Sequence, residues 1–147
     1  MSGETSLRAS ECDEDACWFT YRLTVRFFET DAQRIVHHAN YLVYLEETRS
    51  EFVRARGLSY KEIDARGIAI VLAKAEMRCV APATFDDELV VYMRPVNVGS
   101  RLATFEYRIE NAATGSLLVR ARTTHAFVDE AMKSVRAPEW LRQGLSL

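Results

Sequence analysis

The sequence lacks a surplus of charge of either sign, because 19 lysines and arginines stand against 21 aspartates and glutamates, a formal net charge of -2 at pH 7. Such a chain has no broad positive field, so neither nucleic acid nor an anionic membrane is expected as a partner. Long hydrophobic runs are missing too: the run at 68–73 falls far short of the roughly 20 apolar residues that cross a bilayer. No basic segment followed by an apolar one opens the chain, so we expect neither export nor membrane insertion.

Cysteine is scarce and metal-ligand spacing is absent. Cys12, Cys17 and Cys79 form an odd set whose spacing matches neither a disulfide framework nor a metal site, so we expect no metal and a reducing cytoplasm. No internal repeat or low-complexity block is present. With 48% hydrophobic residues and a length of 147, the composition predicts one globular domain with a real core.

The apolar pattern predicts a chain of mixed α and β structure. Residues 1–17 are acidic and poor in apolar side chains, so we expect a mobile tail there, followed by a single domain over 18–147. The helical and strand periods predict a strand over 20–27, a long helix over 40–56, a short helical turn over 60–65, and strands over 68–80, 88–97, 101–110 and 117–128. This order cannot form a βαβ repeat, so the fold class is α+β with the helix on an antiparallel sheet.

Polar residues with chemical potential gather where the first strand leads into the long helix, in the segment 27–41. Backbone N–H groups at a helix start lack intrahelical partners and carry the positive end of the helix dipole. Such groups can hold an oxyanion, and a thioester carbonyl could be polarised by them. The start of the helix, 41–45, is apolar on all sides, which indicates a central helix or a subunit interface.

This segment resembles the 4-hydroxybenzoyl-CoA thioesterase branch of the hot-dog superfamily, which includes the Tol-Pal-associated acyl-CoA thioesterases, and the likeness extends over about 21–128. The matching residues are Glu29, Thr30, Asp31, Ile35, Val36, His38, Ala39, Asn40 and Tyr41, then Glu46 and Arg49, then Pro82, Asp86, Asp87, Glu88 and Leu89. The resemblance implies a hot-dog fold, an antiparallel sheet of about five strands wrapped around one long helix. It also implies hydrolysis of an acyl-CoA without a metal or redox cofactor, coenzyme A being part of the substrate. Relatives build each site between two subunits, which implies a homodimer or homotetramer.

By the same resemblance, Asp31 is the catalytic carboxylate, which would activate water as a base or attack the thioester itself. A turn or cap aspartate is the alternative. His38 matches a family histidine whose ring would orient substrate or whose N–H would polarise the carbonyl, and a solvated histidine is the alternative. Glu46 is the rival carboxylate, because some other hot-dog thioesterases use a helix glutamate. Its alternative is a supporting role or pairing with Arg49.

Four more residues are candidates for substrate binding. Tyr41 belongs to the motif, with a core residue as the alternative. Arg34 stands where relatives usually have glycine, and a left-handed backbone there would cost roughly 1–2 kcal/mol. Either the loop shifts and moves the oxyanion donors, or the guanidinium contacts an anionic part of the substrate. Arg94 and Arg101 flank the turn at 98–100, where relatives bind the nucleotide end of coenzyme A, and ordinary surface arginines are the alternative.

Two other functions stay open: a hot-dog acyl-CoA dehydratase or hydratase with a histidine and acid pair, and a non-catalytic acyl-binding module. His125 shares a strand face with apolar residues, so we interpret it as a hydrogen-bonded core or interface histidine. Aromatic residues near the site, Phe27, Phe28, Tyr41 and Tyr44, favour an apolar pocket. They predict activity on medium-chain or aromatic acyl-CoA above acetyl-CoA.

Overall fold

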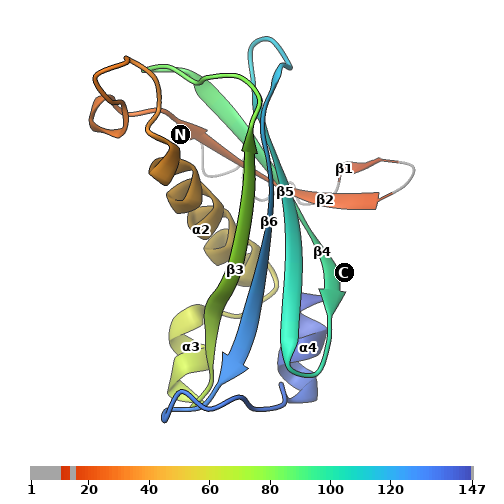
Figure 1. Cartoon of the computed structure of the whole chain (residues 1–147). Helices are drawn as coiled ribbons and strands as arrows, with labels where there is room; N and C mark the ends of the chain where they lie inside the picture. The colour runs from red at the N-terminus through yellow and green to blue at the C-terminus, as the bar shows by residue number, and fades with distance from the viewer. Residues whose placement is uncertain (1–10, 14–15, 147) are drawn as a thin grey trace.

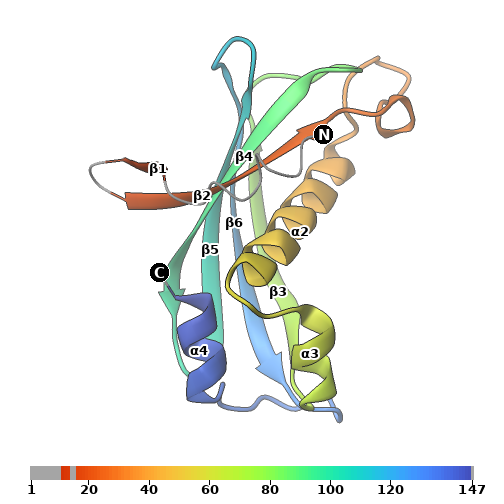
Figure 2. The ribbon, with the colours of Figure 1, turned by 180° about the vertical axis from the view of Figure 1, so that it is seen from behind.

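The computed structural model describes residues 11–13 and 16–146 (Figure 1). The elements are β1 (Glu11–Asp13), β2 (Ala16–Thr24), the 3-10 turn η1 (Phe27–Glu29), α2 (His38–Ala55), α3 (Tyr60–Ala65), β3 (Ala69–Cys79), β4 (Glu88–Val98), β5 (Leu102–Asn111), β6 (Leu117–Val128) and α4 (Glu139–Leu145). Figures 1 and 2 show the three helices on the same face of one curved sheet. The other face of the sheet carries no helix in the described part of the chain.

The strands pair in the order β1-β2-β4-β5-β6-β3, and every pair is antiparallel. Short turns join β4, β5 and β6, because the apolar strand segments break there at turn residues such as Gly99 and Gly115. The long connection through α2 carries the chain across the sheet, so β3 pairs with β6 from Ala69↔Val128 to Cys79↔Val119. This arrangement leaves one long edge of β3 without a strand partner among the described residues.

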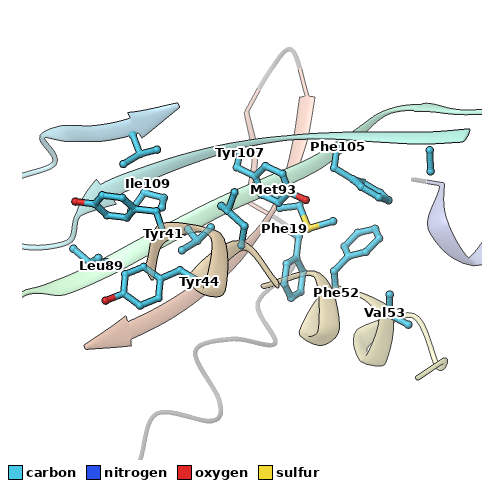
Figure 3. Close-up of a cluster of buried hydrophobic side chains, with 14 of the residues drawn as sticks. Phe19, Tyr41, Tyr44, Phe52, Val53, Leu89, Met93, Phe105, Tyr107 and Ile109 are labelled. Carbon is cyan, nitrogen blue, oxygen red and sulfur yellow. The ribbon is translucent and has the colours of Figure 1, made fainter. Parts of the chain in front are cut away.

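Helix α2 lies across the sheet and its apolar stripe forms the core (Figure 3). Phe52 makes edge-to-face contacts with Phe19 of β2 and Phe105 of β5, at ring-centroid distances of 5.5 Å and 6.3 Å. Tyr44 and Leu45 are also almost fully buried. Burying each such side chain contributes on the order of 1.5–3 kcal/mol, so the helix is held firmly against the sheet. The packing of α2 therefore fixes the position of its first residue, His38, and of the loop that precedes it.

The α+β hot-dog prediction is confirmed, and the helices and the last four strands lie within a few residues of their predicted bounds. The first strand differs, since β2 begins at Ala16 and ends at Thr24. Residues 27–29 form a 3-10 turn instead, because the carboxylate of Glu29 accepts the N–H of Arg26 at 2.8 Å. Helix α4 was absent from the predictions, although Leu141 and Leu145 bury it against the rest of the fold.

The N-terminal segment differs from its prediction where the structure describes it. The tail predicted over 1–17 lies mostly outside the described residues, and the described part forms β1 and the start of β2. Cys17 is disulfide-bonded, which corrects the expectation that the cysteines form no disulfide. An odd number of cysteines still allows two of them to pair. Cys79 is a free thiol. Within the described ranges, no helix is long and apolar enough to cross a membrane.

Candidate active site

The loop between η1 and α2 carries Asp31, and backbone hydrogen bonds close it into a compact ring. Thr30 and Val36 form an antiparallel bridge across its base. Inside the ring, the N–H of Asp31 donates to the carbonyl of Ile35 at 3.0 Å. The N–H of Val36 donates to the carbonyl of Ala83 at 2.8 Å, which ties the loop to the segment between β3 and β4. The loop is therefore fixed on two sides.

Arg34 closes the tight turn of this loop in a glycine-like conformation. Its φ of 67° lies in the left-handed region, and its N–H donates to the carbonyl of Asp31 at 2.9 Å. The turn is thus kept rather than displaced, at a cost of roughly 1–2 kcal/mol for a residue with a Cβ. The side chain is exposed and stays outside the lining of the cavity that Asp31 faces.

The Asp31 side chain is held by its own loop. Oδ1 accepts the N–H of Gln33 at 2.8 Å, the hydrogen bond of an Asx turn. Oδ2 has no protein partner in the part of the chain that the structure describes. Asp31 therefore does act as a turn residue, but the turn uses only Oδ1, and Oδ2 has no partner among the described residues. A half-buried carboxylate with one free oxygen can serve as a base or a nucleophile.

A cavity of about 330 Å³, here called the Asp31 cavity, lies between this loop, the start of α2 and the end of β3. It is lined by Asp31, Gln33, Ile35, Val36, His38, Tyr41, Cys79, Val80, Ala81 and Pro82. In Figure 1 the loop and the segment after β3 lie side by side at the same end of the molecule. The lining is mainly apolar, with the carboxylate among its few charged groups, so it suits an uncharged thioester.

The start of α2 lies at the Asp31 cavity. His37 is the N-cap: its Nδ1 accepts the N–H of Ala39 at 3.2 Å, and its carbonyl accepts the N–H of Asn40 at 2.8 Å. The ring of His37 stacks on that of His38, with centroids 4.2 Å apart. The N–H of His38 has no protein acceptor among the described residues, and His38 lines the cavity. A free N–H at the positive end of a helix can stabilise an oxyanion.

Glu29 anchors the loop from the core side and is only 3% exposed. Its carboxylate accepts the N–H and the guanidinium of Arg26 at 2.8 Å and 2.9 Å, and the hydroxyl of Tyr44 at 2.9 Å. Its carbonyl accepts the N–H of His37 and Nδ2 of Asn40. Burial raises the pKa of the Glu29 carboxyl, but the hydrogen bonds from Arg26 and Tyr44 outweigh it and hold that pKa below its usual value. Sequence reasoning missed this role, because the partners come from separate elements.

Glu46 lies in a second cavity, of about 290 Å³, between α2, α3 and β3. Its lining consists of Glu46, Arg49, Ser50, Tyr60, Ile70, Leu72 and His125. Within one chain, Glu46 and Asp31 are therefore not brought together. Arg49 donates to the hydroxyl of Tyr107 at 3.2 Å, and no ion pair joins it to Glu46 in the described ranges. The ion pair considered between Glu46 and Arg49 is therefore not present among the described residues.

His125 is a buried core histidine, as predicted. It is 2% exposed, and its Nε2 lies 2.9 Å from Oγ1 of Thr123. Burial, helped by the charge of Arg49, lowers the pKa of His125 to about 4, so the ring is neutral at pH 7.

Tyr41 is both a core residue and part of the cavity wall. Its hydroxyl accepts the N–H of Ala83 at 3.3 Å, and burial raises the pKa of the phenol above its ordinary value. It shares the cavity lining with Asp31 and His38, so the structure brings together three of the seven candidates.

Within one chain, Arg94 and Arg101 lie away from the Asp31 cavity. Arg94 forms an ion pair with Glu106, and its guanidinium covers the ring of Trp18 at 4.4 Å. Arg101 belongs to the turn between β4 and β5, at the opposite end of the sheet from the Asp31 loop (Figure 1), and donates to Ser134 at 3.1 Å. The role of this turn in binding the nucleotide end of coenzyme A stays a prediction.

Comparisons with known proteins identify the family to which the chain is similar. Residues 25–145 match the family model of the thioesterase-like superfamily. An acyl-CoA thioester hydrolase of Escherichia coli O157:H7 is 30% identical over 119 residues, which cover 81% of this chain and 88% of that protein. The crystal structure of a protein from Aquifex aeolicus has a TM-score of 0.83 at 34% identity, covering 87% of this chain and 99% of that one. A 1,4-dihydroxy-2-naphthoyl-CoA thioesterase from Synechocystis has a TM-score of 0.81 at 25% identity, covering 87% and 95%.

Proposed function

The chain belongs to the thioesterase-like superfamily and hydrolyses coenzyme A thioesters, and we propose that Asp31 drives this reaction in the Asp31 cavity. One observation carries the proposal: Asp31 and His38 line the same cavity, and among the described residues one carboxylate oxygen of Asp31 and the backbone N–H of His38 have no protein partner. A thioester needs both a group that brings an oxygen nucleophile to its carbonyl carbon and a donor for the carbonyl oxygen.

In the proposed reaction, Asp31 as a base takes a proton from water while the water oxygen bonds to the thioester carbon. The carbonyl oxygen becomes an oxyanion and accepts the N–H of His38 at the start of α2. The carbon–sulfur bond then breaks, the thiolate of coenzyme A takes up a proton, and the free acid leaves. If Asp31 attacks directly, it forms a mixed anhydride that water cleaves to the same products. Both routes require the ionised carboxylate.

We propose a medium-chain or aromatic acyl group as the substrate. The support comes from the apolar lining of the cavity, and from a relative named 1,4-dihydroxy-2-naphthoyl-CoA hydrolase in Nostoc punctiforme, 28% identical over 117 residues. Three of the four aromatic residues expected in the pocket lie elsewhere: Phe27 and Phe28 are 73% and 71% exposed, and Tyr44 is buried against Glu29. Of those four side chains, Tyr41 is the one in the cavity lining.

A homo-oligomer is also proposed, with a dimer built through the free edge of β3. Leu72 of β3 is 51% exposed, and Leu42 and Val43 of α2 are exposed as well. A second subunit would bury this apolar surface. If two β3 edges pair antiparallel across a two-fold axis, the end of β3 in one protomer, at Cys79, lies beside the beginning of β3 in its partner. The Asp31 cavity of one protomer would then adjoin the second cavity of its partner, which contains Glu46.

Two finer assignments belong to the same proposal. Arg34 has no ion pair among the described residues, and its exposed guanidinium, beside the cavity, would contact an anionic part of the substrate. The cytoplasm stays the proposed compartment, although disulfides are rare there and Cys17 is disulfide-bonded. A thiol count on protein purified under native redox conditions tests the compartment.

Thiol release from acetyl-, hexanoyl- and benzoyl-CoA tests the proposed function. We expect hexanoyl- or benzoyl-CoA to be cleaved faster than acetyl-CoA. A dehydratase or hydratase would release no thiol from the saturated hexanoyl group, which has no double bond to hydrate. A non-catalytic binding module would bind the thioesters without turnover. A preference for acetyl-CoA would contradict the proposed acyl group.

A further inference from the structure

A histidine side chain, and not one of the usual cap residues, closes the start of α2. His37 is the N-cap, a position where serine, threonine, aspartate and asparagine are preferred because their side-chain oxygen accepts a backbone N–H of the first turn. Here Nδ1 of the His37 ring takes that role and accepts the N–H of Ala39 at 3.2 Å. The cap of this helix therefore depends on an imidazole nitrogen.

The capping hydrogen bond fixes the protonation state of the His37 ring. A backbone N–H only donates, so Nδ1 is the acceptor and carries no proton. A protonated imidazole has a donor on both nitrogens and cannot accept this N–H. His37 is half-buried, so solvent can protonate it, and histidine is the side chain whose charge changes between pH 5 and 8. The cap is present while the ring is neutral and is lost when the ring is protonated.

The surroundings of His37 provide no counter-charge for a protonated ring. The ring stacks on that of His38, with centroids 4.2 Å apart, so two protonated rings would repel each other. The first turn of α2 has no acidic side chain, and the positive end of the helix dipole disfavours a further cation. The titratable and charged groups on the neighbouring elements are Arg26 and Glu29 of η1, Asp31 and Arg34 of the loop, Tyr41 of α2, Cys79 of β3, and Asp86 and Asp87 after β3. In the part of the chain that the structure describes, none of these groups pairs with either ring.

The cap also leaves one backbone donor for the substrate. The N–H groups at a helix start have no acceptor within the helix. At α2 the N–H of His37 donates to the carbonyl of Glu29 at 2.9 Å, that of Ala39 to the His37 ring, and that of Asn40 to the carbonyl of His37 at 2.8 Å. The N–H of His38 has no protein acceptor among the described residues, and His38 lines the Asp31 cavity. The proposed reaction uses this N–H for the oxyanion.

We propose that His37 is a positioning residue: its neutral ring fixes the first turn of α2 and thereby the N–H of His38, and its protonation lowers turnover. The proposal rests on the acyl-CoA hydrolysis proposed above and adds pH control to that site. The hydrogen bond from the His37 N–H to Glu29 does not involve the ring, so protonation releases the first turn without detaching the loop. Because an oxyanion forms only in the transition state, kcat should respond and KM should not.

The pH dependence of thiol release from hexanoyl-CoA tests this role. The wild-type kcat should fall roughly three- to tenfold from pH 7.5 to pH 5.5, the loss expected when one histidine titrates and only its neutral form is active. His37→Ala has no cap at any pH, so its kcat at pH 7.5 should already lie near the wild-type value at pH 5.5, with KM within about twofold. In His37→Asn the side-chain oxygen can accept the N–H of Ala39 and does not titrate. This variant should rescue the kcat that His37→Ala loses and change by less than about twofold between the two pH values.

A matched control and a readout without turnover separate the cap from other effects of pH. His38→Asn removes the neighbouring imidazole and keeps the backbone N–H, so whatever its kcat at pH 7.5, the fall towards pH 5.5 should persist. Hydrogen exchange of the Ala39 amide, followed by NMR and expressed as a protection factor, reports the cap itself. Its protection should drop at least about threefold from pH 7.5 to pH 5.5 in the wild type, stay constant in His37→Asn and be low at both pH values in His37→Ala.

An acid-side fall in His37→Asn equal to that of the wild type would overturn the proposal, because another group, such as Asp31, would then be the one that titrates. A flat profile in His38→Asn would also overturn it, since the neighbouring ring would be responsible. So would a wild-type kcat in His37→Ala. If the wild type cleaves no thioester at any pH, the proposed hydrolysis fails. In that case the protection of the Ala39 amide still decides whether the His37 cap opens as the pH falls.

Discussion

Glu29→Gln tests how the fold holds the catalytic loop. Glutamine has nearly the same shape, and its oxygen can still accept the N–H of Arg26 or the hydroxyl of Tyr44. In the wild type, Oε2 of Glu29 accepts hydrogen bonds from Nη2 and Nε of Arg26 at 2.9 Å and 3.2 Å. The NH₂ group of glutamine in that place would be a donor facing the guanidinium donors of Arg26, so these hydrogen bonds would be lost. The Arg26 side chain is 60% exposed, so its ion pair is screened and worth under about 1 kcal/mol.

The buried hydrogen bonds dominate the expected loss. Each hydrogen bond to a charged group contributes about 1.5–3 kcal/mol, and glutamine keeps part of one of them, so we expect a loss of about 2–3 kcal/mol in the free energy of unfolding. Tyr44→Phe removes one of these bonds and should lose less. Because the carbonyl of Glu29 also holds His37 and Asn40, the start of α2 should loosen, and kcat should fall about tenfold with little change in KM.

The pH dependence separates this role from general destabilisation. The pKa of the Glu29 carboxyl is lowered in the folded protein, so its contribution to stability is fully present above the unfolded pKa of about 4.3 and is lost as the pH falls through the folded pKa. The stability gap between wild type and Glu29→Gln, measured by urea unfolding, should therefore narrow below about pH 4. A variant with wild-type stability and kcat, or a gap that does not change with pH, would refute this reasoning.

Two further predictions concern the loop and the edge of the sheet. Arg34→Gly should raise the free energy of unfolding by up to about 1 kcal/mol in thermal melts, because glycine adopts the φ of 67° without strain and the flexibility it adds to the unfolded chain offsets part of that gain. A KM for acyl-CoA that stays at the wild-type value in this variant would contradict the contact proposed for Arg34. Leu72→Lys places a charge on the free edge of β3 and should shift the protein towards monomers in sedimentation runs, whereas Leu102→Lys, at another exposed apolar position, should not. A wild type that sediments as a monomer in dilute solution would defeat the proposed oligomer.

The parts of the fold with long, regular patterns were predictable from sequence. β5 alternates over nearly all of its 10 residues, β4 and β6 are long and rich in apolar residues, and α2 keeps one apolar stripe along its length. Short elements were not: η1 depends on a hydrogen bond from Arg26 to Glu29, and α4 has only 7 residues, fewer than a periodic signal needs. The predicted extension of the first strand to Phe27 failed because local hydrogen bonding outweighed the alternation.

In the candidate site, too, the residues of one local motif could be predicted from the sequence, and the contacts between separate elements could not. Asp31 and His38 share one cavity because a single short loop presents both, so a local motif was enough to find them. The role of Glu29 depends on contacts between two separate elements, η1 and α2. Such contacts are set by helix packing and strand register, which no spacing in one sequence reveals.

The assignment of Asp31 is tested most directly by thiol release from Asp31→Asn beside Glu46→Gln. Asparagine can still accept the N–H of Gln33, so the loop should keep its turn, but it can neither take a proton from water nor attack the thioester. We expect Asp31→Asn to bind acyl-CoA and melt like the wild type while its turnover falls by about 10²–10⁴, and Glu46→Gln to keep substantial turnover. Near-normal turnover by Asp31→Asn, together with its loss in Glu46→Gln, would show that the helix glutamate is the catalytic acid and would contradict the account.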